Sequence, residues 1–322
     1  MDWRVKAFVQ AGLGALPPRL GDPLYHALQR RRGLRPNAVG HRDLVRRLER
    51  ALAAEGAAGL PGRSVVELGS GWFPLTPLLL LARGARRVQT FDTAEHYSPA
   101  RIRAAAAALL AEGEAHRVIE EAAGTGRLPR SVVYRPRTRL EAAEGVERAD
   151  LGVSRFTLEH VPAETIAAIH RRSRDWMAPG GWWLHWVSPS DHRAYDDRRL
   201  SLVDFLRYSD AEWARIAGNR YAYHNRLRRS DYVLLFAEAG WEVCAEEGEA
   251  SPAQMAALGE LPLAEKYRGR PFEDLAASSL WFSLRARSAD EPLPKAVPLE
   301  DRAARDGEDS GADPEGRAQH AG

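Results

Sequence analysis

The sequence predicts an α/β fold in which helices cover both faces of a mostly parallel sheet. From Ser64 onwards, short apolar runs rich in β-branched residues alternate with helical patterns. Such alternation requires right-handed βαβ crossovers. A turn with two glycines, Gly69 and Gly71, separates the first predicted strand from the first helix of this series. The 322 residues are enough to bury a large core.

Residues 1–60 are predicted to form an N-terminal helical segment. Trp3, Phe8 and Val9 make a short apolar stripe that ends before two prolines. A second helix, HRDLVRRLERALAAEG, has leucines at every fourth position and ends at a glycine.

Residues 61–287 are predicted to form the main domain. The strands expected in its first part are 64–68, 86–92, 131–135, 149–156 and 182–188, with helices at 74–85, 98–113 and 163–178. A polar stretch rich in Arg and Tyr, residues 189–229, then interrupts the alternation and is predicted to be a helical cap. A helix at 230–240 and strands at 241–246 and 280–287 complete a predicted seven-stranded sheet.

The last 35 residues, 288–322, contain nine acidic and four basic residues and almost no large apolar ones. Such a segment cannot bury enough surface to offset its ordering entropy, so a disordered acidic tail is expected.

Bulk composition excludes several function classes. The net charge of +2 divides into −5 on residues 288–322 and +7 on residues 1–287, so the body is mildly basic, which suits an anionic small ligand but not nucleic acid. A single cysteine and the absence of zinc-like Cys/His spacing predict no disulfide and no metal. No apolar run is long enough to span a membrane, and the N-terminus does not resemble a signal peptide, so a cytoplasmic protein is expected. The oligomeric state is not predicted.

The glycine turn, SVVELGSGWFP, is typical of a nucleotide cradle. A P-loop would need Gly-Lys-Ser/Thr at its end, and a dinucleotide fingerprint would need a glycine where Pro74 stands. An S-adenosylmethionine site shares the geometry without a pyrophosphate contact. Glu67, before the turn, suits the cationic amino-acid end of that ligand, and Asp92, after the second strand, suits ribose hydroxyls. An NAD site also places an acid there.

In order and spacing, four segments resemble the class I S-adenosylmethionine-dependent methyltransferases: VVELGSG, TFD, ADLGVSRFTLEHVP and MAPGGWWLHW. The closing GWEV and LWFSLRAR look like that family's sixth strand and antiparallel seventh strand. The resemblance covers residues 64–287 and implies a Rossmann-like fold, S-adenosylmethionine as cofactor and methyl transfer. The sequence departs from the family at Phe73, where a third glycine is common. The predicted cofactor-binding residues are Glu67, Gly69, Ser70, Gly71, Asp92 and Ser154. Ser154 could equally be an ordinary turn serine.

Candidates for proton transfer and acceptor binding follow the fourth and fifth strands, because ligands in open α/β sheets gather at strand carboxyl ends. The predicted catalytic residues are His160, His192 and Asp191. His160 could instead donate to the substrate or have no chemical role, and His185 is predicted to be a core histidine. The predicted substrate residues are Tyr221, His224, Asn225 and Arg226, with Arg226 holding an anionic group. The alternative is that the insert is a solvated lid.

The predicted function is methyl transfer from S-adenosylmethionine to a small-molecule or glycan acceptor, on an oxygen, by in-line displacement. An NAD(P)-dependent oxidoreductase and a non-catalytic protein that retains the fold are the alternatives. A nucleic-acid methyltransferase is disfavoured because Ser154–Arg155–Phe156–Thr157 stands where an amino-methylating enzyme has its Pro-Pro motif. Methyl transfer needs no metal, although a magnesium-assisted subtype stays open.

Overall fold

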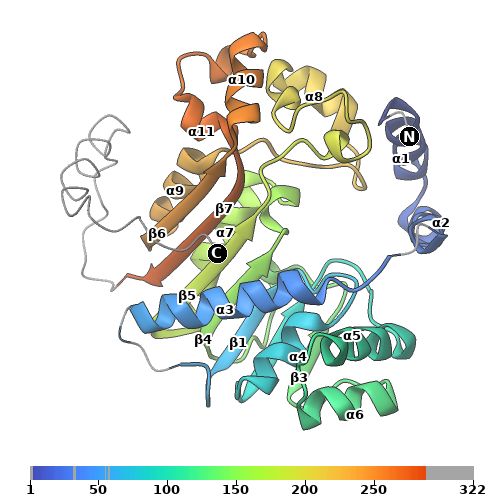
Figure 1. The fold of residues 1–322 in the computed structure, drawn as a ribbon, viewed down its shortest axis with the longest axis vertical. Coiled ribbons are helices and arrows are strands. Elements are labelled where there is room, and N and C mark those ends of the chain that lie inside the picture. Colours follow the sequence, from blue (N-terminus) through green and yellow to red (C-terminus); the bar gives the residue numbers. More distant parts are fainter. Residues whose placement is uncertain (1–2, 32–33, 55, 57–58, 288–322) are drawn as a thin grey trace, which may run out of the picture.

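A computed structural model describes residues 3–31, 34–54, 56 and 59–287. The predicted tail, 288–322, lies outside the described residues. The structure is built around one mixed sheet with helices on both of its faces (Figure 1).

The sheet has seven strands in the order β3-β2-β1-β4-β5-β7-β6. β7 runs antiparallel to both of its neighbours, and the first five strands run parallel. This confirms the predicted Rossmann-like class I methyltransferase fold. The strands are β1 (Ser64–Leu68), β2 (Arg87–Phe91), β3 (Val132–Arg135), β4 (Ala149–Arg155), β5 (Met177–Val187), β6 (Trp241–Ala250) and β7 (Ala277–Ala286).

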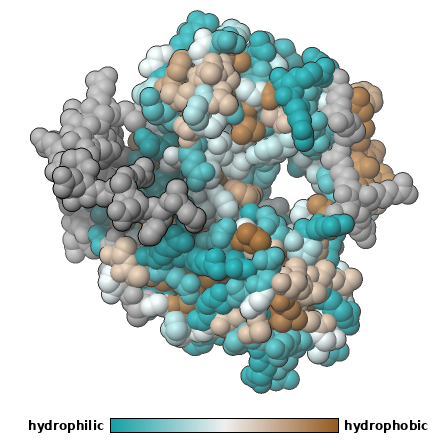
Figure 2. All heavy atoms as spheres, viewed as in Figure 1, coloured by the Kyte–Doolittle hydropathy of each residue, from teal (hydrophilic) through white to brown (hydrophobic). Residues whose placement is uncertain are grey.

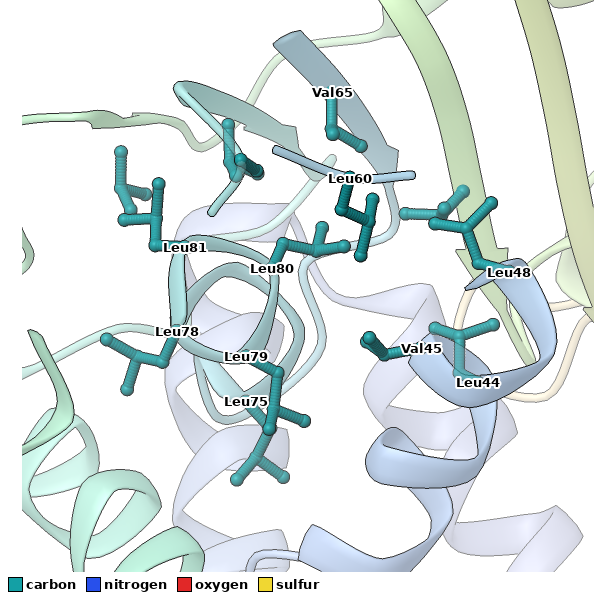
Figure 3. Packing of buried hydrophobic residues seen from close by; sticks show 14 of the residues in the cluster. Leu44, Val45, Leu48, Leu60, Val65, Leu75, Leu78, Leu79, Leu80 and Leu81 are labelled. Atoms are coloured by element: carbon teal, nitrogen blue, oxygen red, sulfur yellow. The ribbon is translucent and has the colours of Figure 1, made fainter. Parts of the chain in front are cut away.

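Two apolar cores lie on opposite faces of the sheet. Adjacent residues of a strand point to opposite faces, and the fully buried Val65 and Val66 belong to different cores. One core is made with α3 (Ala38–Ala54), α4 (Leu75–Ala82), α5 (Pro99–Ala111) and α6 (Arg117–Thr125). The other is made with α7 (Ala163–Ser173) and α9 (Arg229–Glu238). Figure 3 shows Leu80 of α4 pointing toward Leu60 and the leucines of α3, beneath Val65, while Leu78 points to the opposite side of α4.

Strand order places the ligand edge of the sheet. β1 lies between β2 and β4, so the crossovers that leave β1 and β3 run in opposite directions. This reversal opens a crevice at the carboxyl ends of β1 and β4, where open α/β sheets bind ligands. Leu68 pairs with Phe91 on one side and with Ser154 on the other, which fixes the register of that edge.

The insert has a small core of its own, contrary to the expectation of a polar cap without a packed interior. It contains the 3-10 helices η3 (His192–Tyr195) and η4 (Asp204–Arg207) and the helix α8 (Asp210–Ala217). Phe205 and Trp213 pack there against residues from η5 (Glu265–Tyr267), α10 (Pro252–Glu260) and α11 (Phe272–Ala276). Neither α10 nor α11 was predicted from the sequence, and both supply apolar partners that residues 189–229 lack.

The predicted N-terminal segment divides in two: its third helix, α3, packs in a core of the sheet, whereas its first two helices fold back over the insert. α1 (Trp3–Ala15) and α2 (Pro18–Arg31) stand beside the body rather than against the sheet (Figure 1). Tyr25 stacks on Tyr221 with ring centroids 4.2 Å apart, and Gln10 Nε2 donates to the Tyr221 carbonyl oxygen at 3.0 Å. The stripe containing Phe8 is not a core face, since Phe8 is 81% exposed.

Other differences from the prediction have local causes. α6 was not predicted, because its sequence contains few apolar residues. The helix is defined by its ends: His116 is the N-cap, and Gly126 at the C-terminal end is in the left-handed conformation. β5 begins at Met177, before the predicted Trp182, because Gly180, at φ +68°, lets the strand pass through an irregular step. Short 3-10 helices, η1 (Leu140–Ala142) and η2 (Leu158–His160), follow β3 and β4. His185 is a core histidine as predicted, bonded to Ser154 and His170.

Candidate functional site

The described residues form two adjoining cavities at this edge of the sheet. The larger one, with a volume of about 790 Å³, lies at the carboxyl ends of β1, β2 and β4. Gly69 and Gly71 line it from β1, Asp92 lines it from β2, and Thr157 and His160 line it after β4. Its volume is within the range of small-molecule and cofactor sites. Of the predicted cofactor residues, Gly69, Gly71 and Asp92 therefore lie at this cavity.

The glycine turn requires its glycines. Gly69 has φ +82° and Gly71 has φ +62°, a region that other residues rarely adopt. A Cβ on Gly69 would lie 2.2 Å from Thr157 Oγ1, whereas a Cβ on Gly71 would meet no atom within 4 Å. Gly69 thus lets the turn pack against Thr157, and Gly71 leaves open space on the cavity side.

Asp92 holds the turn and faces the cavity. Its Oδ2 accepts from Ser70 Oγ at 3.2 Å and from the Gly71 backbone N–H at 3.3 Å, and its Oδ1 accepts from the Ala94 N–H at 2.9 Å. The two contacts to Oδ2 are long for hydrogen bonds to a carboxylate. Ligand hydroxyl groups could replace them at little cost.

Three predicted cofactor residues are not part of the cavity lining. Glu67 is buried inside β1, where Thr90 Oγ1 donates to its carboxylate at 2.6 Å. Burial raises the pKa of Glu67 to about 8. Ser70 is 2% exposed and supports Asp92. The Ser154 hydroxyl is bonded to His185 Nδ1 at 2.8 Å, in the core. These three side chains therefore support the strand ends, and only Ser70 contacts a residue that faces the ligand space.

A smaller cavity of about 240 Å³ lies next to the first. The insert contributes Asp191, His192, Tyr221 and His224, while α1 and α2 contribute Trp3, Lys6, Gln10 and Tyr25. Figure 2 shows an opening between the N-terminal helices and the body of the molecule. The predicted cap thus forms a cavity wall, but it shares that wall with helices that the sequence analysis had assigned no role.

His160 lines both cavities. Its Nδ1 lies 3.0 Å from the Tyr223 carbonyl oxygen, which can only accept, so Nδ1 carries the proton and Nε2 is left as an acceptor. The side chain keeps solvent access through the cavities, yet surrounding protein desolvates it and lowers its pKa. A neutral imidazole with an available Nε2 therefore stands where the two cavities meet.

His192 and His224 complete a cluster with His160. The ring centroids of His160 and His192 are 5.1 Å apart, and those of His192 and His224 are 4.2 Å apart. Burial, and then the neighbouring His160 and Lys6, lower the pKa of His192 to about 3. Burial also holds the pKa of His224 well below its usual value. All three rings are consequently neutral at pH 7.

Asp191, predicted to be catalytic, uses both of its carboxylate oxygens in contacts with Arg193. Its Oδ1 accepts from the Arg193 backbone N–H at 2.9 Å, and both of its oxygens accept from the Arg193 guanidinium. Asp191 is thus the N-cap of η3 and one side of a buried ion pair. It positions the loop that carries His192 instead of acting on the ring.

Asn225 and Arg226 are structural, and neither lines the smaller cavity. Asn225 Nδ2 donates to the carbonyl oxygens of Leu158 and Val161, at 2.7 and 2.8 Å. Arg226, 5% exposed, donates to the carbonyl oxygens of Phe205 and Tyr208 and pairs with Asp210. Arg226 therefore directs these donors into the fold of the insert and lines neither cavity, so its predicted role in binding an anionic acceptor stays a prediction.

Some residues at the two cavities were missed by the sequence analysis. Arg137–Glu141, the loop after β3, lines the larger cavity. Arg193 and Trp213 line the smaller one, where the Arg193 guanidinium lies 4.6 Å from the Trp3 ring centroid. The Arg-rich loop after β3 contains no motif whose spacing predicts a binding site.

No helix among the described residues is long and apolar enough to cross a membrane.

Comparisons with known proteins give fold-level likeness only. No protein-family model matches the sequence, and no curated protein matches it. An S-adenosylmethionine-dependent methyltransferase from Mesorhizobium loti is 16% identical, with 73% of this chain and 95% of that chain covered and a TM-score of 0.44. The magnesium protoporphyrin IX methyltransferase of Synechocystis PCC 6803 with bound SAH is 14% identical, with 77% and 84% covered and a TM-score of 0.45. A geranyl diphosphate methyltransferase in complex with SAM is 11% identical, with 78% and 85% covered and a TM-score of 0.45. At these identities and TM-scores, the likeness does not indicate the activity of this chain. The activity has to be inferred from the chain's own site.

Proposed function

We propose that the chain binds S-adenosylmethionine in the larger cavity and transfers its methyl group to an oxygen of a small-molecule or glycan acceptor in the smaller one. The observation that carries this proposal is the junction of the two cavities at His160. A transferase needs a donor and an acceptor in adjoining spaces, with the reacting atoms held in line.

The residues at the larger cavity fit this cofactor. Gly71 leaves open space beside the turn, Asp92 offers a carboxylate to ribose hydroxyls, and the loop 137–141 adds polar groups on the far side. The bound cofactor supplies a methyl group on a sulfonium, which is already a good leaving group. The chain therefore has to position the acceptor and receive one proton.

The residues at the smaller cavity fit a hydroxylated ring. Trp3, Tyr25, Trp213 and Tyr221 provide flat apolar surface. The cationic side chains there are already paired, Lys6 with Asp196 and Arg193 with Asp191, so they do not favour an anionic acceptor over a neutral one. The available Nε2 of His160 is placed to take the proton of an acceptor hydroxyl, with neutral His192 beside it. General bases of this kind contribute roughly 10²–10⁴-fold to rate.

Calorimetry tests the cofactor assignment. The full chain is titrated with S-adenosylmethionine, S-adenosylhomocysteine, NAD⁺ and NADPH. We expect binding of the first two only, and Asp92→Asn should weaken it by about tenfold or more, because hydrogen bonds to a charged group are worth roughly 1.5–3 kcal/mol. Asp175→Asn, an exposed aspartate beyond α7, is the matched control and should bind like the parent.

Binding of NADPH without S-adenosylmethionine would replace the proposal with the oxidoreductase alternative. Binding of S-adenosylmethionine with no transfer of a labelled methyl group to any hydroxylated acceptor, followed by mass spectrometry, would favour a non-catalytic protein. For a true acceptor, His160→Ala should lower turnover without weakening cofactor binding.

A further inference from the structure

We propose that Glu159, His160 and His192 bind one divalent transition-metal ion of the zinc class where the two cavities meet. One ligand atom from each of the three side chains lies within 4.8 Å of the other two. Glu159 and His160 come from η2, after β4, and His192 comes from η3, after β5. The fold therefore brings together a carboxylate and two imidazoles that are 32 residues apart in the sequence.

Buried atoms without hydrogen-bond partners point to the same place. Glu159 is fully buried, its Oε1 accepts from the Ser188 N–H at 3.4 Å, and its Oε2 has no partner. The Ser188 backbone also lies near the His224 ring, yet neither ring nitrogen reaches hydrogen-bond geometry. An unsatisfied buried polar group costs about 1–3 kcal/mol, and more when it is charged. A cation bound here would compensate the carboxylate and supply the missing partner.

The two histidines can present nitrogen atoms to an ion. His160 Nδ1 donates to the Tyr223 carbonyl oxygen, which leaves Nε2 as the ligand atom. Metal-binding histidines usually have their second nitrogen held in this way. Ligand atoms about 2.0–2.2 Å from a tetrahedral zinc are roughly 3.4 Å from one another. Closing the site from 4.8 Å thus needs side-chain shifts of about 1 Å.

The ligand set selects the kind of ion. Two imidazoles and one carboxylate suit Zn²⁺, Fe²⁺, Mn²⁺ or Co²⁺, whereas Mg²⁺ and Ca²⁺ prefer sites made of oxygen atoms. His224, with its ring centroid 4.2 Å from that of His192, is available as a fourth ligand. With three protein ligands, one coordination position of a tetrahedral ion would stay open to a further ligand.

The role of the ion, unlike its binding, rests on the proposed function. An open position would bind the hydroxyl oxygen of the acceptor, hold it beside the larger cavity and lower its pKa, so that its proton would leave to solvent and the methyl group would pass to the oxygen. Coordination would use the same Nε2 of His160 that otherwise receives the proton. The two roles of His160 are therefore exclusive, and metal dependence of turnover separates them.

The test uses the full chain after removal of metal with a chelator. It is titrated with Zn²⁺ and Mg²⁺ by calorimetry and with Co²⁺ by visible absorption. We expect one Zn²⁺ per chain, Co²⁺ bands that Zn²⁺ displaces, and no comparable Mg²⁺ binding. His192→Ala and Glu159→Gln should each weaken Zn²⁺ binding by at least about 100-fold, since loss of even an outer-shell partner costs roughly 10–100-fold. His116→Ala, an exposed histidine at the start of α6, is the matched control and should bind like the parent.

Absence of one-to-one Zn²⁺ binding, or equal binding in His192→Ala, overturns the proposal. His192 lies at a cavity wall rather than in a core, so this variant decides the matter even if the buried Glu159→Gln fails to fold. S-adenosylmethionine affinity is measured on the metal-free protein. Zinc binding without S-adenosylmethionine binding would support the metal site and reject the proposed function. S-adenosylmethionine binding without zinc binding would support the proposed function and reject the metal site.

Discussion

Replacing Glu67 with glutamine should make the stability of the fold less dependent on pH. Glu67 lies inside β1 with Thr90 donating to its carboxylate, and burial raises its pKa from 4.5 to about 8. Between those two values the native state keeps a proton that the unfolded chain has released. The stabilising contribution is therefore complete below about pH 4.5 and is lost as the pH rises to about 8.

The magnitude follows from the interval. Each pH unit within it lowers the free energy of unfolding by up to about 1.4 kcal/mol. Between about pH 5.5 and about pH 8, the parent should lose up to about 3 kcal/mol through this residue. Glutamine has the same shape and does not titrate, so the variant should gain on the parent by that amount over the same range.

Urea unfolding of both proteins at several pH values measures the difference. Glu238→Gln, an exposed glutamate on α9, is the matched control and should run parallel to the parent. A free-energy difference between Glu67→Gln and the parent that stays constant from about pH 5.5 to about pH 8 would refute the reasoning.

Two further predictions concern the turn and the insert. Gly69→Ala should lower the free energy of unfolding by about 2 kcal/mol and weaken cofactor binding at least tenfold, because Gly69 has φ +82° and an added Cβ would clash with Thr157. Gly259→Ala, on α10 with open space around it, is the control and should be neutral or slightly stabilising in urea unfolding and neutral in calorimetry. Equal effects of the two substitutions would contradict this account. Arg226→Ala should destabilise the fold by about 2–4 kcal/mol, because it removes the guanidinium donors from the carbonyl oxygens of Phe205 and Tyr208 and breaks the ion pair with Asp210. Cofactor affinity should stay unchanged. A loss of turnover with full stability, measured beside the exposed Arg198→Ala, would return Arg226 to the acceptor site.

The cofactor edge of the sheet was predictable because its signal is local. Gly69, Gly71 and Asp92 follow two strands directly, and parallel strands bring their carboxyl ends to one edge. Glu67 and Ser154 precede the strand ends, so the alternation of side chains and the depth of the edge decide whether they reach the cavity. The depth of the sheet edge depends on how helices pack on both faces of the sheet, and the spacing of residues in the sequence does not reveal it.

The acceptor side was less predictable because its residues are distant in sequence. Arg226 has the residue type of an anion binder, and only the carbonyl oxygens around it show that its donors are used. The histidine cluster joins η2, η3 and His224, and no motif spacing connects them. Trp3 and Tyr25 complete the smaller cavity from the far end of the chain.

That arrangement affects how the protein should be prepared. Trp3 is at the wall of the smaller cavity, so a tag fused on the amino-terminal side of Trp3 would be tethered close to that wall. A hexahistidine tag in that position would bring extra imidazoles next to His160 and His192 and could compete for the same zinc. Recombinant material intended for metal or acceptor titrations should therefore carry its tag at the other terminus, or have it cleaved before the first measurement.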